Sequence, residues 1–165
     1  MVKPYYEQDG IQIWLGDCHE ILPSLQVDLV LADPPYGIGY VHGAINIPHA
    51  TKFAGVKVTG DSEPFDLAWL LRYPNLVLWG ANHYADRLPV ERWLAWDKRC
   101  GVIPERDTSD CEFAWARGTG GNCAREARVH PTQKPVALMI WCLGFYPAAR
   151  REGLVAIDGY RGVKL

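Results

Sequence analysis

The feature that most constrains the fold is a nearly continuous apolar run, 27–32, that stops abruptly at Asp33-Pro34-Pro35-Tyr36. Such runs are typical of strands in the middle of a parallel sheet, because these strands are buried on both faces. Two further runs, 75–79 and 154–157, have the same character. A sheet of this kind needs helices on its faces, and its ligand site lies at the carboxyl ends of the strands.

The remaining segments complete an alternating pattern of strands and helices. A hairpin is predicted to enter a strand at 11–15, and Asp17 is predicted to cap a helix that reaches Leu25. Further elements are expected as helices at 64–71 and from 136 onward, and as strands at 93–97 and 112–115. The pattern predicts an α/β protein with a doubly wound, mostly parallel sheet. A length of 165 residues indicates a single domain, 1–165.

Composition narrows the class of protein further. Hydrophobic residues make up 48% and charged residues 22%, as in ordinary globular domains. The longest apolar stretch, Val136–Tyr146, is shorter than the ~20 residues that span a bilayer, so no membrane contact is expected. The five cysteines contain no C-x-x-C pair, so we expect neither disulfides nor a metal site. Five tryptophans are expected in the core: Trp79, Trp93, Trp96, Trp115 and Trp141.

Charge leaves the question of nucleic acid open. The formal net charge of −2 provides no overall basic surface. Basic residues nevertheless outnumber acids between positions 117 and 151. The arginines at 117–128 either grip phosphates or keep the surface hydrated.

Asp33-Pro34-Pro35-Tyr36 combines groups that suit a planar amine. The two prolines remove backbone donors and leave carbonyl oxygens as acceptors beside the carboxylate. These oxygens can accept both hydrogens of an exocyclic amine, while the tyrosine ring stacks on a heterocycle. The alternative is a turn with a capping aspartate and a packed tyrosine.

The D-P-P-Y motif at a strand end resembles the catalytic motif of amino-directed, S-adenosylmethionine-dependent DNA methyltransferases, in the form typical of N6-adenine enzymes. His130-Pro-Thr-Gln-Lys-Pro135 resembles a segment of the β-type branch of that family, in which the catalytic motif precedes the cofactor motifs. Asn75–Tyr84 and Trp96-Asp-Lys98 resemble a phage and prophage subset. The resemblance implies a Rossmann-like methyltransferase fold and site-specific methylation of a flipped adenine in double-stranded DNA, as in restriction–modification. It also implies a cytoplasmic protein of a bacterial or phage-infected cell.

The resemblance also implies roles for individual residues. The catalytic group is Asp33, Pro34, Pro35 and Tyr36. The residues expected to bind S-adenosylmethionine are Asp17, His130, Thr132, Gln133, Lys134, Pro135, Asp158 and Gly162. Asn82 and His83 are expected to line the pocket for the target base, and no metal is implied. Simpler alternatives stay open: Asp17 as a helix cap, 130–135 as a polar helix start, Lys134 as a solvated charge, and Asn82 and His83 as a turn.

The cofactor loop departs from the family. Asp158, Tyr160 and Gly162 keep its frame, but the other expected proline, serine and glycine are replaced before Leu165. We therefore expect a member truncated in this loop, with little or no activity, whose incomplete sheet edge favours self-association. Two alternatives remain, namely a non-catalytic remnant that binds DNA or a partner, and an RNA N-methyltransferase.

Overall fold

A computed structural model describes residues 3–41, 55, 57–58, 60–98, 111–118, 123–125, 134–144 and 154–158. The chain divides into two compact units, and each is described by itself. The sheet unit consists of Val27–Asp33 and Leu67–Ala156. The hairpin unit consists of Met1–Gln26, Pro34–Asp66 and Ile157–Leu165.

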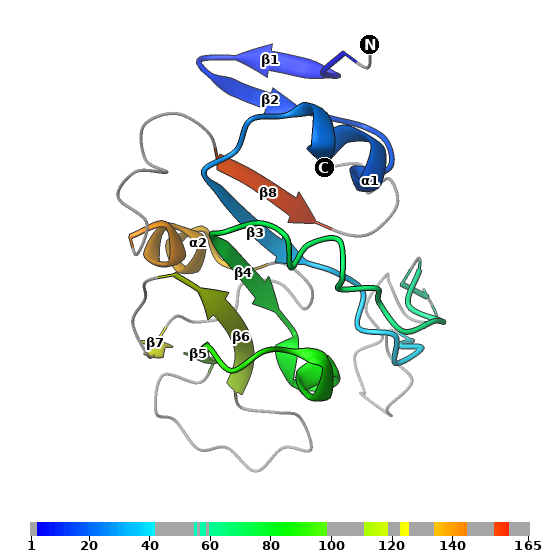
Figure 1. Ribbon diagram of the computed structural model, residues 1–165, viewed down its shortest axis with the longest axis vertical. Coiled ribbons are helices and arrows are strands. Elements are labelled where there is room, and N and C mark those ends of the chain that lie inside the picture. The colour runs from blue at the N-terminus through cyan, green and yellow to red at the C-terminus, as the bar shows by residue number, and fades with distance from the viewer. Residues whose placement is uncertain are drawn as a thin grey trace. The chain divides into compact units, whose positions relative to one another are not determined.

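The main element of the described chain is a six-stranded sheet with the order β7-β5-β6-β4-β3-β8 (Figure 1). Its strands are β3 (Leu29–Asp33), β4 (Leu76–Trp79), β5 (Arg92–Asp97), β6 (Cys111–Arg117), β7 (Cys123–Arg125) and β8 (Leu154–Asp158). Strands at 75–79, 93–97, 112–115 and 154–157 were predicted, and all four are present within one or two residues of these bounds. The short strand β7 was not predicted.

The sheet is mixed, with one reversed strand among the five whose pairing is described. β3 pairs parallel with β4, and β5 pairs parallel with β7. β4 and β5 both pair antiparallel with β6, so β3, β4, β5 and β7 run in one direction and β6 runs in the other. The fold is therefore α/β, and the mostly parallel sheet that we predicted contains an antiparallel strand at its centre. Consecutive strands that pair antiparallel, such as β5 and β6, need no crossover helix.

This arrangement places the carboxyl ends of β3, β4 and β5 and the amino end of β6 at one edge, which we call the carboxyl edge. The register fixes the details, since Asp97 pairs with Cys111 and Trp96 pairs with Glu112. Polar residues that follow the three parallel strands, or that begin β6, are brought to this edge.

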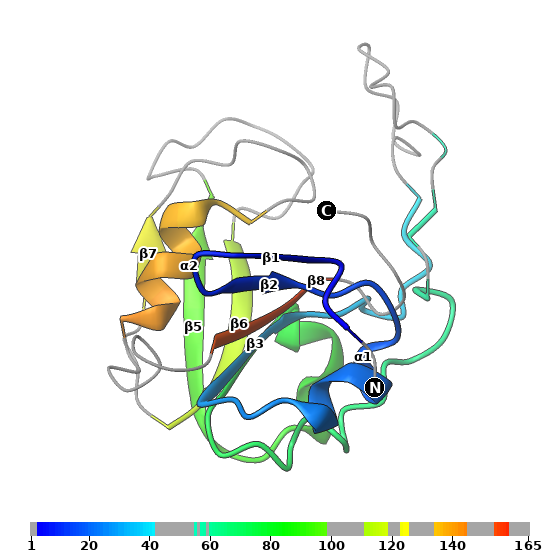
Figure 2. The same ribbon diagram turned by 90° about the horizontal axis from the view of Figure 1, so that it is seen from above.

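The core lies between the sheet and helix α2 (Val136–Leu143), which packs beside the strands in Figure 2. Side chains alternate between the two faces of a strand, and the set that faces α2 forms the buried cluster. Its members are Leu29, Leu31, Val77, Trp79, Leu94, Trp96, Ala114, Ala116, Leu138 and Cys142. A helix after Pro135 was predicted from the spacing of the apolar residues 138, 141, 142 and 145, and α2 confirms it. In the part of the chain that the structure describes, no helix is long and apolar enough to cross a membrane.

The tryptophans follow the predicted pattern with one exception. Trp79, Trp96 and Trp115 are fully buried, and Trp79 meets Trp96 edge-to-face at 6.3 Å. Trp141 packs partly buried against the core. Trp93 is 40% exposed, although its cross-strand partner Trp115 on the same face of the sheet is fully buried. The expectation that all five are core residues is wrong for Trp93.

Two segments near β4 differ from the prediction. The helix expected at 64–71 is absent, and the segment forms turns in which the Leu70 and Leu71 N–H groups donate to the Leu67 carbonyl. Phe65, Leu67 and Leu70 are buried there, and their spacing does not form one face of a helix. After β4, the helical segment η2 (Ala81–Arg87) was not predicted, and it begins after Gly80 with a φ of 69°.

The hairpin unit begins with β1 (Tyr6–Gln8) and β2 (Ile11–Ile13), which pair antiparallel as predicted. Asp9 and Gly10 form the turn with positive φ angles of 51° and 79°. The next helix, α1 (Cys18–Ile21), passes into the 3-10 turn η1 (Leu22–Ser24) instead of continuing to Leu25. Pro23 explains the early end, because it has no N–H to donate to an α-helical carbonyl.

Candidate active site

Asp33 is the last residue of β3, at the carboxyl edge of the sheet. It lies two residues after Leu31 and therefore shares the face that α2 covers. Its side chain is 19% exposed. The strand delivers a largely buried carboxylate to the edge at which ligands bind in sheets of this class.

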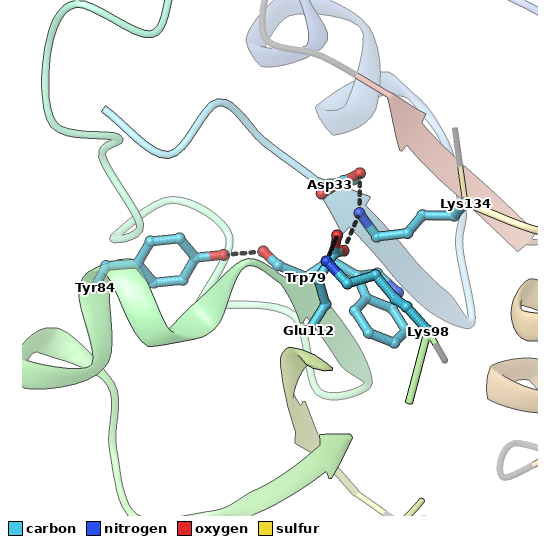
Figure 3. Close-up of polar contacts among 6 residues, drawn as sticks. All are labelled: Asp33, Trp79, Tyr84, Lys98, Glu112 and Lys134. Atoms are coloured by element: carbon cyan, nitrogen blue, oxygen red, sulfur yellow. Dashed lines mark hydrogen bonds and ion pairs between the residues drawn. The ribbon is translucent and has the colours of Figure 1, made fainter. Parts of the chain in front are cut away.

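Asp33 belongs to a chain of four charged side chains, which we call the carboxylate–lysine cluster (Figure 3). The Lys134 Nζ lies 2.7 Å from Asp33 Oδ2 and 3.0 Å from Glu112 Oε2. The Lys98 Nζ lies 3.2 Å from Glu112 Oε1. Lys134 is only 10% exposed and Lys98 13%, so both cations are largely removed from water.

Each member of the cluster reaches the carboxyl edge from a different element. Lys98 directly follows β5, and Glu112 is the second residue of β6. Lys134 precedes α2, whose N-cap is Pro135. Because β6 is reversed, its beginning rather than its end lies beside the ends of β3 and β5. The pairing of Trp96 with Glu112 then sets Glu112 close to Lys98.

The charges of the cluster balance, and the pKa values of Lys134 and Glu112 are shifted in the directions that keep these two side chains ionised. Burial alone would favour neutral Lys134, but the Asp33 and Glu112 carboxylates outweigh it and hold the pKa of Lys134 above its usual value. Burial would likewise favour neutral Glu112, but Lys134 and Lys98 hold the pKa of Glu112 below its usual value. Lys134 is therefore a fixed cation beside Asp33.

Two aromatic residues line this part of the edge. The Lys134 Nζ lies 5.6 Å from the centre of the Trp79 ring, within the range of a cation–π contact. The buried Trp79 Nε1 has no hydrogen-bond partner among the residues that the structure describes. The Tyr84 hydroxyl donates to the Trp79 carbonyl and thereby ties η2 to the end of β4. Burial and the Asp33 charge raise the pKa of Tyr84, so the hydroxyl stays protonated and remains a donor.

The predicted pocket residues Asn82 and His83 lie in η2, which follows β4 at the same edge as Asp33. Both are exposed, whereas their neighbour Tyr84 is fully buried. The structure therefore brings Asn82 and His83 to the predicted edge, but Tyr84 is the residue of η2 that packs inward. Their role toward a base stays a prediction.

The predicted cofactor residues are described only in part. Lys134 and Pro135 lie at the start of α2, and Asp158 is the last residue of β8, the neighbour of β3 in the strand order. Lys134 contacts two carboxylates, so the alternative of a solvated charge is wrong. The remaining four predictions, for His130, Thr132, Gln133 and Gly162, lie outside the described residues.

Asp17 caps α1 in the hairpin unit, as predicted. One of its carboxylate oxygens accepts the His19 N–H at 2.9 Å and lies 3.0 Å from His19 Nδ1. The Cys18 thiol lies close to both side chains, and the potential metal-ligand atoms of Asp17, Cys18 and His19 are within 4.8 Å of one another. These contacts are those of a helix cap, and the role of Asp17 toward a cofactor stays a prediction.

Arg117 has a structural role at the end of β6. Its guanidinium donates to the Leu71 carbonyl at 2.5 Å and lies over the Trp115 ring at 5.2 Å. These contacts use Arg117 to join β6 to the segment before β4. The sequence left two roles open for the arginines at 117–128, namely binding phosphates and keeping the surface hydrated. The structure gives Arg117 a third role, which is to pack β6 against the segment before β4.

Sequence reasoning missed Glu112, Lys98 and Tyr84 as members of the site. Glu112 is an acidic residue at the start of an otherwise apolar strand, which is a signal for a paired charge. Lys98 was noted in Trp96-Asp-Lys98 without a role, and Tyr84 ends the segment Asn75–Tyr84. Only the pairing of β5 with β6 shows that Glu112 and Lys98 belong together.

No protein-family model matches the chain, and no curated protein matches it. The functional argument therefore rests on the chemistry of the carboxyl edge. This edge offers the Asp33 carboxylate, two lysines that are paired with carboxylates, and the buried ring of Trp79. Such a site can accept hydrogen bonds from an amine and exclude water around it.

Proposed function

We propose that this protein is a site-specific, S-adenosylmethionine-dependent DNA methyltransferase that acts on adenine N6 and has a Rossmann-like methyltransferase fold. The observation that carries the proposal is the contact between Lys134 and Asp33. It joins the D-P-P-Y motif to the lysine of the H-P-T-Q-K-P motif across 101 positions of the chain, at 2.7 Å. Two motifs that resemble the same family thus contribute to one cluster.

In the proposed reaction the target adenine is flipped out of the duplex, at a cost of a few kcal/mol in lost stacking. Asp33 and the Pro34 carbonyl accept hydrogen bonds from the amine, which is neutral and conjugated with its ring. These acceptors draw electron density from the N–H bonds toward N6 and make it a better nucleophile. Tyr36 stacks on the base, and the fixed orientation supplies much of the rate.

The cluster holds Asp33 in place for this reaction. Lys134 lies against one carboxylate oxygen, Oδ2, and fixes the orientation of the carboxylate plane. Glu112 holds Lys134 from its other side, and Lys98 neutralises Glu112. Lys134 and Glu112 are positioning residues in this proposal, because they act through Asp33.

The chemistry of the donor set fits the cofactor. S-adenosylmethionine carries a positive sulfonium and hydroxyl groups. The balanced cluster has no net positive charge that would repel the sulfonium, and its carboxylates can accept hydrogen bonds from the hydroxyl groups. When bound, the cofactor would supply an electrophilic methyl group to N6. The electron pair of the broken carbon–sulfur bond would stay on sulfur, and the proton that N6 loses would pass to water. The residues proposed to hold it are those of the resemblance: Asp17, His130, Thr132, Gln133, Lys134, Pro135, Asp158 and Gly162.

The test is transfer of a labelled methyl group. The chain is incubated with labelled S-adenosylmethionine and with either duplex DNA or RNA, and the labelled nucleoside is identified. We expect N6-methyladenine in DNA at a low level, because the cofactor loop lacks the proline, serine and second glycine of the family. The label should be lost in Asp33→Ala and kept in Asp86→Asn, which changes an exposed acid of η2. Label in RNA alone, or label that persists in Asp33→Ala, would contradict the proposal.

A further inference from the structure

The loop that follows Tyr36 is held by one buried carboxylate. Asp61 is 3% exposed, and among the described residues it is the one charged side chain in the buried class. Its Oδ1 accepts the Gly37 N–H at 2.7 Å and the Ile38 N–H at 3.3 Å. Its Oδ2 accepts the Tyr40 N–H at 2.6 Å. The main-chain oxygen of Asp61 accepts the remaining Gly39 N–H at 2.8 Å.

Four consecutive N–H groups therefore end on one residue, and we call this arrangement the amide cage. Charge-assisted bonds to backbone N–H groups are among the stronger hydrogen bonds of proteins. Gly37 and Gly39 adopt positive φ angles of 74° and 63°, which turn successive N–H groups toward the same point. The carboxylate and the backbone conformation thus require each other.

The cage begins at the residue that follows the D-P-P-Y motif. On one side of Tyr36 the prolines at 34 and 35 fix φ, and on the other side Asp61 binds the N–H groups of Gly37 and Ile38. Gly37 is also closely packed, since a Cβ there would lie 2.7 Å from the Glu63 carbonyl oxygen. The backbone of Tyr36 is thereby fixed from both sides, although Asp61 lies more than twenty positions away.

We propose that Asp61 is a positioning residue for Tyr36, which orients the tyrosine ring for stacking on the target base. The proposal rests on the proposed function for the identity of the stacked group. The anchoring itself does not depend on catalysis. Asp61 lies in no motif that the sequence analysis identified. Its carboxylate contacts the loop after Tyr36 directly, so the contact needs no bound substrate.

The first measurement is amide hydrogen exchange at 36–40, in the wild type and in Asp61→Asn. The amide keeps one acceptor oxygen but loses the second, so exchange at these positions is expected to become at least about tenfold faster. The matched control is Glu63→Gln, which removes an exposed charge from the same segment. Unchanged exchange in Asp61→Asn would overturn the anchoring, whatever the enzyme assay gives.

The second measurement is a double-mutant cycle in the methylation assay. Asp61→Asn and Tyr36→Ala are each expected to lower kcat/KM by about 10- to 100-fold, the range that the loss of one stacked base gives. If Asp61 acts through Tyr36, the double variant is no more than about twofold worse than Tyr36→Ala alone. Effects that multiply would overturn the positioning role.

A failure of the proposed function can be distinguished from a failure of the anchoring of Tyr36. Absence of Asp33-dependent methylation in the wild type contradicts the proposed function, and the exchange experiment then decides the anchoring of Tyr36. If Asp61→Asn does not fold, Gly37→Ala replaces it, because it strains the same loop and leaves the carboxylate in place. Gly37→Ala is expected to accelerate exchange at 36–40 in the same way, and normal protection would count against the cage.

Discussion

Asp61 in the hairpin unit and Glu112 in the sheet unit are both carboxylates withdrawn from water, but their partners differ in kind. Asp61 is surrounded by main-chain N–H groups of one loop. Glu112 contacts two lysine side chains that come from distant parts of the chain. In the first case the partners are part of the local backbone, and in the second they are the ends of long, rotatable side chains.

The difference in partners gives the two carboxylates different structural tasks. A cage of N–H groups cannot rearrange unless the backbone moves, so it suits the fixing of a loop. Lysine ammonium groups are compact charges on flexible stems, so a lysine can keep one carboxylate while it releases another. The amide cage therefore holds one loop of the hairpin unit, and the carboxylate–lysine cluster joins the ends of several elements of the sheet unit.

The largest effect is expected when the shared cation of the cluster is removed. Lys134→Met leaves Asp33 and Glu112 largely buried without the charge between them. Breaking a buried ion pair by removing one partner costs about 3–5 kcal/mol of the free energy of unfolding. Urea denaturation at pH 7, followed by tryptophan fluorescence, measures this loss.

Lys98→Met is the matched control, because it removes a lysine from the outer end of the cluster. Glu112 keeps Lys134 in this variant, so the expected loss is under about 2 kcal/mol. Equal losses in the two variants would show that Lys134 is no more central to the cluster than Lys98.

The amide cage is tested by the two glycines within it. Gly39→Ala meets open space and carries only the strain of a positive φ, about 1–2 kcal/mol. Gly37→Ala carries the same strain and in addition brings a Cβ to 2.7 Å from the Glu63 carbonyl oxygen. We expect Gly37→Ala to cost about 1–3 kcal/mol more than Gly39→Ala in the same denaturation experiment. If Gly37→Ala lowers the free energy of unfolding no more than Gly39→Ala does, the close packing of the amide cage is contradicted.

Acid should weaken the cluster through Glu112. The pKa of Glu112 is lowered in the folded state, so its contribution to stability is present above the ordinary value of 4.5 and is lost as the pH falls through the lower folded value. Between pH 5 and pH 3, the wild type should therefore lose stability more steeply than Glu112→Gln. Thermal unfolding across this interval gives both slopes, and parallel curves would contradict the assignment.

The smallest effect concerns a buried thiol in α2. Burial raises the pKa of the Cys142 thiol from 9.0 to about 12. Its contribution to stability is therefore complete below pH 9 and is lost as the pH rises toward the folded value. At pH 10 the expected loss is about 1.4 kcal/mol relative to pH 8. Cys142→Ala should show a loss smaller by that amount, and an unchanged slope would contradict the role of the thiol.

Much of the sheet could be predicted because its strands are short apolar runs that end at turn residues. Val27–Ala32 and Leu154–Ile157 belong to this type, and β3 and β8 lie there. The direction of β6 could not be predicted, because a strand with alternating side chains has the same pattern in either direction. The failed helix at 64–71 shows the opposite error, because the buried residues Phe65, Leu67 and Leu70 do not have the spacing of one helix face.

The candidate site could likewise be predicted only in part. Asp33 was predicted, because the sequence shows both the end of its strand and the prolines that follow. Glu112 and Asp61 were not, because neither lies in a motif and their partners are fixed by strand register and by loop conformation. The contact between Lys134 and Asp33 could not be predicted from the sequence, because it depends on the fold. The sequence had indicated a separate role for each of the two residues.

The antiparallel pairing of β5 with β6 has a consequence for how the protein can diversify. Asp97 and Cys111 are paired, and Lys98 bonds to Glu112, so the two ends of the connecting segment are joined independently of what lies between them. Closing a longer connection costs only about 0.6 kcal/mol for each doubling of its length. Insertions between Lys98 and Cys111 are therefore inexpensive for the cluster, and this junction is a place where new surface can be acquired without moving a charged side chain at the carboxyl edge.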